Sequence, residues 1–300
     1  MDPRLRTRGL FAITAAMCFW STAFVMVKGS SLSGPAFALY RLWAGVAISL
    51  VAVAVTRRRL TWSAFRACAL GGVLFAVDIT LGFTSVKHTS VVNIGVIGAL
   101  SPVVIAAISA KLLGERIALR DAALIGLSFV GVVIVVVGSA DQAETTTFGN
   151  VLAFIGIATW SAYWFFTRRV RERFAPIEYF AYVMIAGALT MTPLTFVLDG
   201  APAVPTTADW LAVWGVAIFP GFVGHSLVIW SHRYVESWRA AMITQLVPVL
   251  SSLLAWAILE EAITPVVAVG GAVVIAATGA VIVNAARRES EIIDVVEGPH

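Results

Sequence analysis

The chain has 300 residues, of which 59% are hydrophobic and only 13% are charged, and its mean hydropathy is +0.91. A soluble domain averages roughly 45–50% apolar and about 25% charged residues, so this composition excludes a soluble globular protein. The apolar residues form long continuous runs, which also excludes the short alternating strands of a membrane β-barrel. We therefore expect an all-α polytopic membrane protein.

Ten apolar runs follow one another along the chain, each close to the ~20 residues that a helix needs to cross a bilayer. In chain order they cover 9–27, 35–56, 64–86, 90–112, 120–138, 148–167, 176–198, 208–231, 237–259 and 264–285. Pro35, Pro176 and Pro265 lie at the starts of runs, where a proline costs little because its missing N–H would have no partner in the helix. The sequence thus predicts ten transmembrane helices joined mostly by short loops.

The basic residues favour one orientation of these helices. With the N-terminus placed in the cytoplasm, 18 of the 21 lysines and arginines fall in cytoplasmic segments, while Lys28 and Lys87 fall outside and Arg41 lies within the second run. Cytoplasmic loops typically carry such an excess, so we expect an inner-membrane protein with both termini in the cytoplasm. The net charge of +4 follows from this topology, and we do not interpret it as nucleic-acid binding.

The two halves of the chain repeat each other. Phe19-Trp20-Ser21 matches Thr159-Trp160-Ser161 at an offset of 140 residues, and Leu100-Ser101-Pro102 matches Leu246-Val247-Pro248 at an offset of 146. Five helices per half would give the halves opposite orientations, and such inverted repeats are typical of secondary transporters. We expect a cytoplasmic segment 1–8, a five-helix repeat 9–138, a loop 139–147, a second five-helix repeat 148–285 and a cytoplasmic tail 286–300.

These features resemble the EamA-type branch of the drug/metabolite transporter superfamily. The resemblance rests on Tyr40-Arg41, on Thr89-Ser90-Val91-Val92-Asn93, and on Leu100-Ser101-Pro102 followed by Leu113-Gly114-Glu115, with second-half copies of the last pattern. It covers the chain from about residue 9 to 285. The resemblance implies a ten-helix transporter that moves amino acids or other small metabolites, commonly outward.

Asp78 and His225 are the candidates for proton coupling. Asp78 lies deep within the third run, and a carboxylate there costs at least ~2.5–3.5 kcal/mol unless it meets water, a cation or a proton. His225 lies in the eighth run near the repeat equivalent of Asp78, and histidine titrates close to neutral pH. The alternative for Asp78 is a structural hydrogen bond to a neighbouring helix, and for His225 it is ordinary packing.

Further candidates could line a substrate cavity. Arg41 could bind a substrate carboxylate, although it could equally snorkel or hold helix two in place. The aromatic residues could form an apolar wall or simply pack between helices. The full set of predicted cavity residues is Trp20, Ser21, Tyr40, Arg41, Trp43, Asn93, Trp160, Tyr163, Trp164 and Gln245.

Pro102 and Pro248 are predicted hinges, because a proline within a membrane helix frees a carbonyl and permits a bend; the alternative is a pair of static kinks. Glycines in the fifth and tenth runs suit close helix contacts and could also serve a homodimer. Cys18 and Cys68 lie within apolar runs and indicate packing residues. No metal site or cofactor motif is expected.

The combined prediction is a secondary active transporter that exports a small-molecule substrate such as an amino acid by alternating access, with proton coupling through Asp78. A passive facilitator or a lipid scramblase of the same architecture is the alternative. An enzyme is not expected, because no nucleophile–base set, phosphate-binding glycine loop or metal-ligand cluster is visible in the sequence.

Overall fold

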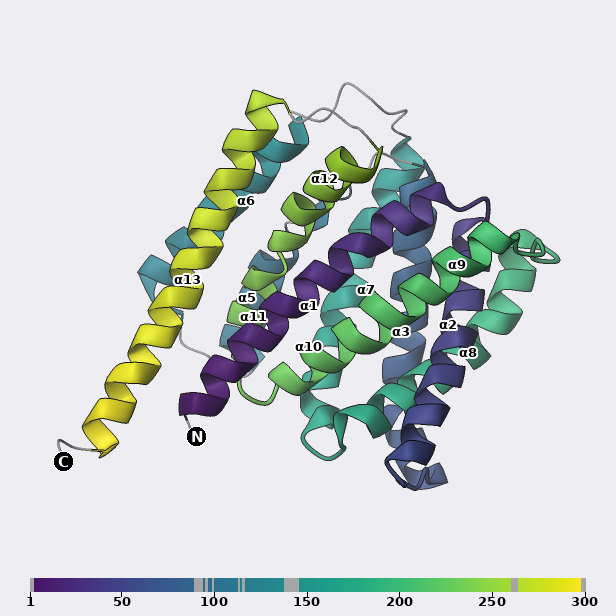
Figure 1. Cartoon of the computed structure of the whole chain (residues 1–300), viewed down its shortest axis with the longest axis horizontal. Coiled ribbons are helices and arrows are strands. Elements are labelled where there is room, and N and C mark those ends of the chain that lie inside the picture. Colours follow the sequence, from purple (N-terminus) through teal and green to yellow (C-terminus); the bar gives the residue numbers. More distant parts are fainter. Residues whose placement is uncertain are drawn as a thin grey trace.

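The computed structural model describes residues 3–88, 94, 97–98, 100–112, 114, 117–137, 146–259 and 264–297. Helices account for nearly all of this part of the chain (Figure 1). In order they are α1 (Pro3–Gly29), α2 (Gly34–Val55), α3 (Trp62–His88), α5 (Ser101–Leu112), α6 (Leu119–Val137), α7 (Thr147–Arg171), α8 (Pro176–Asp199), α9 (Thr207–Val216), η2 (Ala217–Gly224), α10 (His225–Ser231), α11 (Ser237–Ile243), α12 (Leu246–Leu259) and α13 (Pro265–Glu297).

Seven helical segments of the described residues are long and apolar enough to cross a membrane. They are Arg4–Gly29, Gly34–Val55, Trp62–His88, Thr147–Arg171, Pro176–Asp199, Thr207–Ser231 and Ser237–Ile258. Many large apolar side chains on these helices face outward, such as Phe11, Val55 and Val197, as a lipid-facing surface requires. The protein is therefore a multi-pass membrane protein, and the predicted total of ten spans stays a prediction. The fourth predicted run, 90–112, lies partly outside the described residues.

Local signals explain where several helices begin. Ser33 caps α2 by accepting a hydrogen bond from the Ala36 N–H at 3.2 Å. Thr206 caps α9 by accepting from the Asp209 N–H, and Asp209 accepts in return from the Thr206 N–H. Reciprocal capping of this kind satisfies N–H groups that the first turn of a helix leaves without partners.

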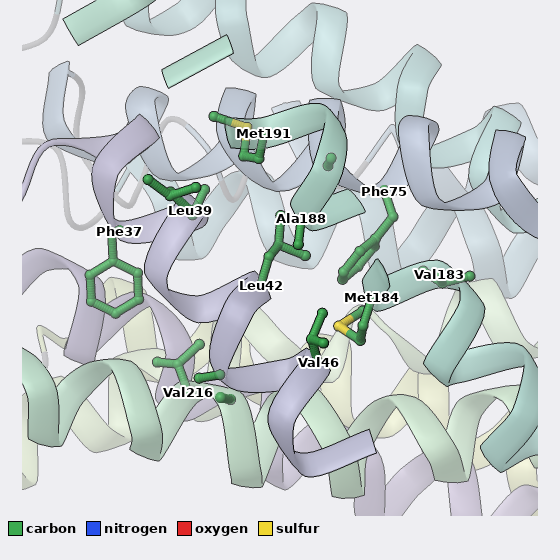
Figure 2. Close-up of a cluster of buried hydrophobic side chains, with 14 of the residues drawn as sticks. Phe37, Leu39, Leu42, Val46, Phe75, Val183, Met184, Ala188, Met191 and Val216 are labelled. Carbon is green, nitrogen blue, oxygen red and sulfur yellow. The ribbon is translucent and has the colours of Figure 1, made fainter. Parts of the chain in front are cut away.

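The main apolar core joins elements from both halves of the chain. Figure 2 shows Leu42 and Val46 of α2 beside Ala188 and Met184 of α8, with Phe75 of α3 close to Met184. α3 approaches α8 closely at Gly72, where an added Cβ would lie 2.7 Å from the Val183 carbonyl oxygen. This packing fixes α3, and with it the residues of α3 that face the centre of the bundle.

A second packing unit pairs α6 with α13 (Figure 1). The two helices meet where an added Cβ on Gly131 would lie 3.0 Å from the Gly270 carbonyl oxygen and 2.9 Å from Val274. A residue without a side chain permits such a backbone approach between membrane helices. The pair therefore depends on the close approach at Gly131 as well as on apolar packing such as that of Val132 with Val274.

Two of the predicted helices differ from continuous α-helices. The predicted run 208–231 contains a π-helical segment, η2, centred near Pro220. The predicted run 237–259 is interrupted at Thr244 and Gln245, between α11 and α12. Pro248 and Pro102 each lie in the first turn of the helix that follows, α12 and α5, where a proline removes no helical hydrogen bond. The predicted hinge motion at these prolines stays a prediction.

Candidate functional site

Asp78 lies on the face of α3 that turns toward α7. Its carboxylate oxygen Oδ1 accepts a hydrogen bond from Thr159 Oγ1 of α7 at 3.2 Å, and the residue is half-buried. Phe75 precedes Asp78 by three residues, so the two side chains lie next to each other on the same face of the helix. α3 thus presents an apolar ring and a carboxylate side by side.

Arg41 of α2 is buried beside them, with only 3% of its surface exposed. Its guanidinium carbon lies 4.9 Å from the centre of the Phe75 ring, a cation–π contact. Nε and Nη1 have no hydrogen-bond partner. Arg41 and Asp78 attract each other electrostatically without forming a direct ion pair. A buried donor without a partner costs about 1–3 kcal/mol or more when it is charged, so these atoms call for an explanation.

His225 begins α10 and is also buried. Its Nδ1 lies 3.2 Å from the Pro220 carbonyl oxygen, and because a carbonyl only accepts, Nδ1 carries the proton. In the neutral ring Nε2 is then an acceptor, and this atom is buried without a partner. The imidazole contacts Phe75 at 4.8 Å and Trp20 at 4.9 Å between ring centres, so Phe75 touches both Arg41 and His225.

Aromatic rings complete the arrangement. Trp20 of α1 packs edge-on against Trp160 of α7 at 5.4 Å, and Trp160 packs against Tyr163 at 5.7 Å. Tyr163 in turn contacts Phe75 at 5.1 Å. We refer to the whole set as the central cluster: Trp20, Arg41, Phe75, Asp78, Thr159, Trp160, Tyr163 and His225.

The π-helical segment η2 shapes one side of the central cluster. The Pro220 carbonyl accepts hydrogen bonds from Trp20 Nε1 at 3.1 Å and from His225 Nδ1. Trp20 lies directly on Gly224, where an added Cβ would be 2.7 Å from the indole Cδ1. Sequence reasoning missed this element. The signal that could have found it is the Pro220-Gly221 pair within an apolar run, because π-helical turns occur mostly within α-helices and often at functional sites.

Several predicted cavity residues lie in the central cluster, and others do not. Trp20, Arg41, Trp160 and Tyr163 meet there, together with the proton-coupling candidates Asp78 and His225. The Ser21 hydroxyl donates to the Cys18 carbonyl of its own helix. Trp164 follows Trp160 by one turn and packs against both Trp160 and His232.

The remaining predicted residues lie farther from the cluster. Tyr40 donates its hydroxyl proton to the Ala203 carbonyl oxygen, and Trp43 is 45% exposed with its indole N–H on Thr192. Gln245 is buried at the break between α11 and α12. Asn93 lies outside the described residues. Within the described ranges no group of three or more His, Cys, Asp and Glu side chains could hold a metal ion.

Comparison with known proteins gives a family match in both halves of the chain. A family described as the EamA-like transporter family matches residues 7–137 and again residues 147–283. A crystal structure of another protein superposes on 92% of this chain and 98% of its own, with a TM-score of 0.73 and 22% identity. That structural likeness supports the fold alone.

Several named proteins are similar to this chain at low sequence identity. A protein of Streptantibioticus cattleyicolor named "Probable terminal-alkyne amino-acid exporter" is 25% identical over 93% of this chain and 94% of its own length. The uncharacterized transporter YyaM of Bacillus subtilis is 25% identical over 59% of this chain, an alignment that spans 60% of the relative. An uncharacterized transporter of Archaeoglobus fulgidus is 23% identical over 84% of this chain.

Proposed function

The chain belongs to the EamA-like transporter family, and from that premise we propose that it is a secondary active exporter of small metabolites such as amino acids. It works by alternating access and is coupled to protons through Asp78. The observation that carries the proposal is the central cluster, in which Arg41 offers two unpartnered donors near the half-buried carboxylate of Asp78. Ionisable groups at this depth are expensive and mark substrate or proton pathways.

The repeat architecture supports the alternating-access part of the proposal. The family match falls once in each half, on 7–137 and on 147–283. Pro102 and Pro248 occupy equivalent places, in the first turns of α5 and α12. In transporters with inverted repeats the substrate site lies between the halves, often beside helices that are interrupted within the membrane. Here the π-helical segment η2, which departs from regular α-helix within Thr207–Ser231, borders the central cluster.

The direction of transport and the membrane orientation are part of the proposal. One relative is named as an amino-acid exporter, and the excess of basic residues in the segments assigned to the cytoplasm favours cytoplasmic termini in the inner membrane. The start of α1 and the end of α13 lie toward the same end of the bundle (Figure 1), as an even number of spans requires.

Asp78 suits proton coupling by its position. Among the described residues its carboxylate accepts one hydrogen bond, from Thr159, and it has one cationic neighbour, Arg41, that is not in direct contact. A carboxylate held so loosely could bind a proton in one state of the transporter and a substrate group in the other. A carboxylate locked in a direct ion pair would lose this freedom, because breaking a buried pair costs several kcal/mol.

Flux measurements test the proposal. Purified protein in proteoliposomes is given each of the common L-amino acids that raises its melting temperature, and accumulation is measured with and without a pH gradient. We expect concentrative flux that depends on the gradient, and an Asp78→Asn variant that retains exchange but loses the response. Trp62→Phe, at an exposed position at the start of α3 and outside every predicted site, is the control and should behave as wild type. Flux that only dissipates a gradient would instead support a passive facilitator, and movement of labelled lipid would support a scramblase.

A further inference from the structure

The central cluster holds a specific pattern of polar atoms without partners. Two are donors, Nε and Nη1 of Arg41, one is an acceptor, Nε2 of His225, and a fourth, the Tyr163 hydroxyl, can donate or accept. Asp78 adds a carboxylate with a single hydrogen bond, from Thr159. Arg41 and His225 both lie within 5 Å of the Phe75 ring centre, and Asp78 is three residues along the same helix face. A cation and two kinds of acceptor therefore border one small region.

The ligand that completes this pattern needs charges of both signs. Buried polar groups are normally hydrogen-bonded, so the groups that fill a site are the complements of those left open. Arg41 needs an anionic acceptor, whereas Asp78 and His225 Nε2 need donors, and the charge on Asp78 favours a cationic one. A simple anion would leave the acceptors open, and a simple cation would leave Arg41 open.

We propose that Arg41 binds the carboxylate of an α-amino acid, while Asp78 and His225 Nε2 bind its ammonium group. This inference assigns the two charged groups of the substrate to individual residues, and it rests on the transport function proposed above. Because Arg41 and Asp78 are not in direct contact, a zwitterion between them gains two charge-assisted interactions without first breaking an ion pair. The ammonium also finds ring faces among Trp20, Trp160 and Phe75.

The Pro220 carbonyl makes His225 an acceptor for the ammonium. It holds the proton of the neutral ring on Nδ1, which leaves the lone pair of Nε2 facing into the cluster. A histidine with the opposite tautomer would offer an N–H and repel the ammonium. The π-helical segment η2 thereby determines which ring nitrogen of His225, the residue that follows it, carries the proton. His225 is a binding residue in this proposal, and the Pro220 carbonyl acts by positioning it.

The walls of the cluster favour an uncharged substrate side chain. Beyond Arg41, Asp78 and His225, the cluster consists of aromatic rings and two uncharged hydroxyls, those of Thr159 and Tyr163, and Thr159 is already bonded to Asp78. The described cluster offers no second pair of charges for a basic or acidic side chain. Burial of an unpaired charge is costly, so we expect neutral apolar amino acids to bind more tightly than lysine or glutamate.

Matched ligand sets test the inference on the full-length wild-type protein. The probes are L-leucine, L-methionine and L-phenylalanine, each with its decarboxylated amine and its deaminated acid, measured by thermal shift and isothermal titration in detergent. For at least one set we expect the amino acid to bind about tenfold or more tightly than either analogue, since a charge-assisted hydrogen bond is worth about one decade or more in affinity. Equal binding of an amine or acid analogue, or binding of none of the compounds, would overturn the proposal.

Two variants should each remove one part of the preference for the amino acid over its analogues. Arg41→Gln should lose the advantage of the amino acid over the amine, and Asp78→Asn should lose its advantage over the acid. Trp62→Phe, at an exposed position outside every predicted site, should preserve the wild-type order. Should a variant fail to yield a monodisperse protein, the ligand sets on the wild type still decide the matter.

Flux of the same compounds separates this inference from the proposed function. Concentrative transport of an amine or an acid in place of the amino acid would agree with the proposed transport function and would refute zwitterion recognition. Tight, selective binding of the amino acid without concentrative flux would support recognition and refute active export.

Discussion

Trp20 and His225 donate to the same carbonyl oxygen, that of Pro220, with Trp20 Nε1 at 3.1 Å and His225 Nδ1 at 3.2 Å. The two side chains come from α1 and from the start of α10, and their rings are 4.9 Å apart. A single backbone atom therefore fixes the orientation of an indole and the tautomer of an imidazole. Such an arrangement makes the position of η2 relative to α1 critical for the central cluster.

Gly224→Ala should disturb this relationship directly. The added Cβ would lie 2.7 Å from Trp20 Cδ1 and 2.8 Å from Nε1, so the indole must move and its hydrogen bond to Pro220 must weaken. We expect a loss of about 1–3 kcal/mol in stability, typical of overpacking, together with a marked fall in substrate affinity. The measurements are melting temperature and ligand titration on the same preparation.

Gly279→Ala is the matched control for that substitution. Gly279 lies in α13, and an added Cβ there meets nothing within 4 Å. Alanine is also a better helix former than glycine. The control should be neutral or slightly stabilising, and equal effects of the two substitutions would argue against the role of the Trp20 contact.

The sequence predicts helix bounds best where a transmembrane helix coincides with one continuous apolar run. The runs 35–56 and 176–198 agree closely with α2 and α8, because composition and the proline at each start determine such helices. The interaction between Thr159 and Asp78 could not be predicted, since it depends on how α3 and α7 pack across the two halves. The hydrophobic periodicity of a sequence predicts that a residue is buried. Its hydrogen-bond partner depends on how the helices pack against each other.

The π-helical segment was missed for a related reason. Hydropathy does not distinguish an α-helical from a π-helical turn, and Pro220 lies within a run that is apolar throughout. Arg41, His225 and Trp20 were all candidates from sequence. The polar atoms of Arg41 and His225 that lack partners, and the bond of Trp20 to Pro220, follow only from how η2, α1 and α2 are arranged in space. Tyr40 and Trp43 are neighbours of Arg41 in sequence, but their side chains lie on other faces of α2. Tyr40 bonds to the Ala203 carbonyl oxygen and Trp43 to the Thr192 hydroxyl.

Asp209 should be the most sensitive acidic residue near the connection between α1 and α2. Its carboxylate accepts from Ser30 Oγ at 2.7 Å, from the Ser31 N–H at 2.8 Å and from Ser31 Oγ at 2.7 Å, in addition to capping α9 through Thr206. Asn offers one acceptor oxygen in place of two and carries no charge. We expect Asp209→Asn to cost about 2–4 kcal/mol, because charge-assisted hydrogen bonds contribute ~1.5–3 kcal/mol each. Thermal unfolding in detergent measures the loss.

Asp199→Asn provides the comparison. Asp199, at the end of α8, accepts a hydrogen bond from Ser33 in the same α1–α2 connection, but it is exposed to solvent. Exposed polar contacts contribute little, typically less than about 1 kcal/mol. A larger effect at Asp199 than at Asp209 would contradict the assignment of Asp209 as the main link between the α1–α2 connection and α9.

Gly131→Ala tests how the α6–α13 pair is held together. A Cβ at residue 131 would lie 3.0 Å from the Gly270 carbonyl oxygen and 3.0 Å from Val273, and a backbone atom cannot yield as a flexible side chain can. We expect the helices to separate, with a fall in melting temperature that corresponds to about 1–3 kcal/mol. Gly126→Ala, on the same helix but with nothing within 4 Å of the added Cβ, should leave the melting temperature unchanged or raise it. Since neither residue lies in the central cluster, ligand affinity should survive in both variants. A drop in affinity with Gly131→Ala at temperatures well below unfolding would mean that the α6–α13 pair also supports the central cluster.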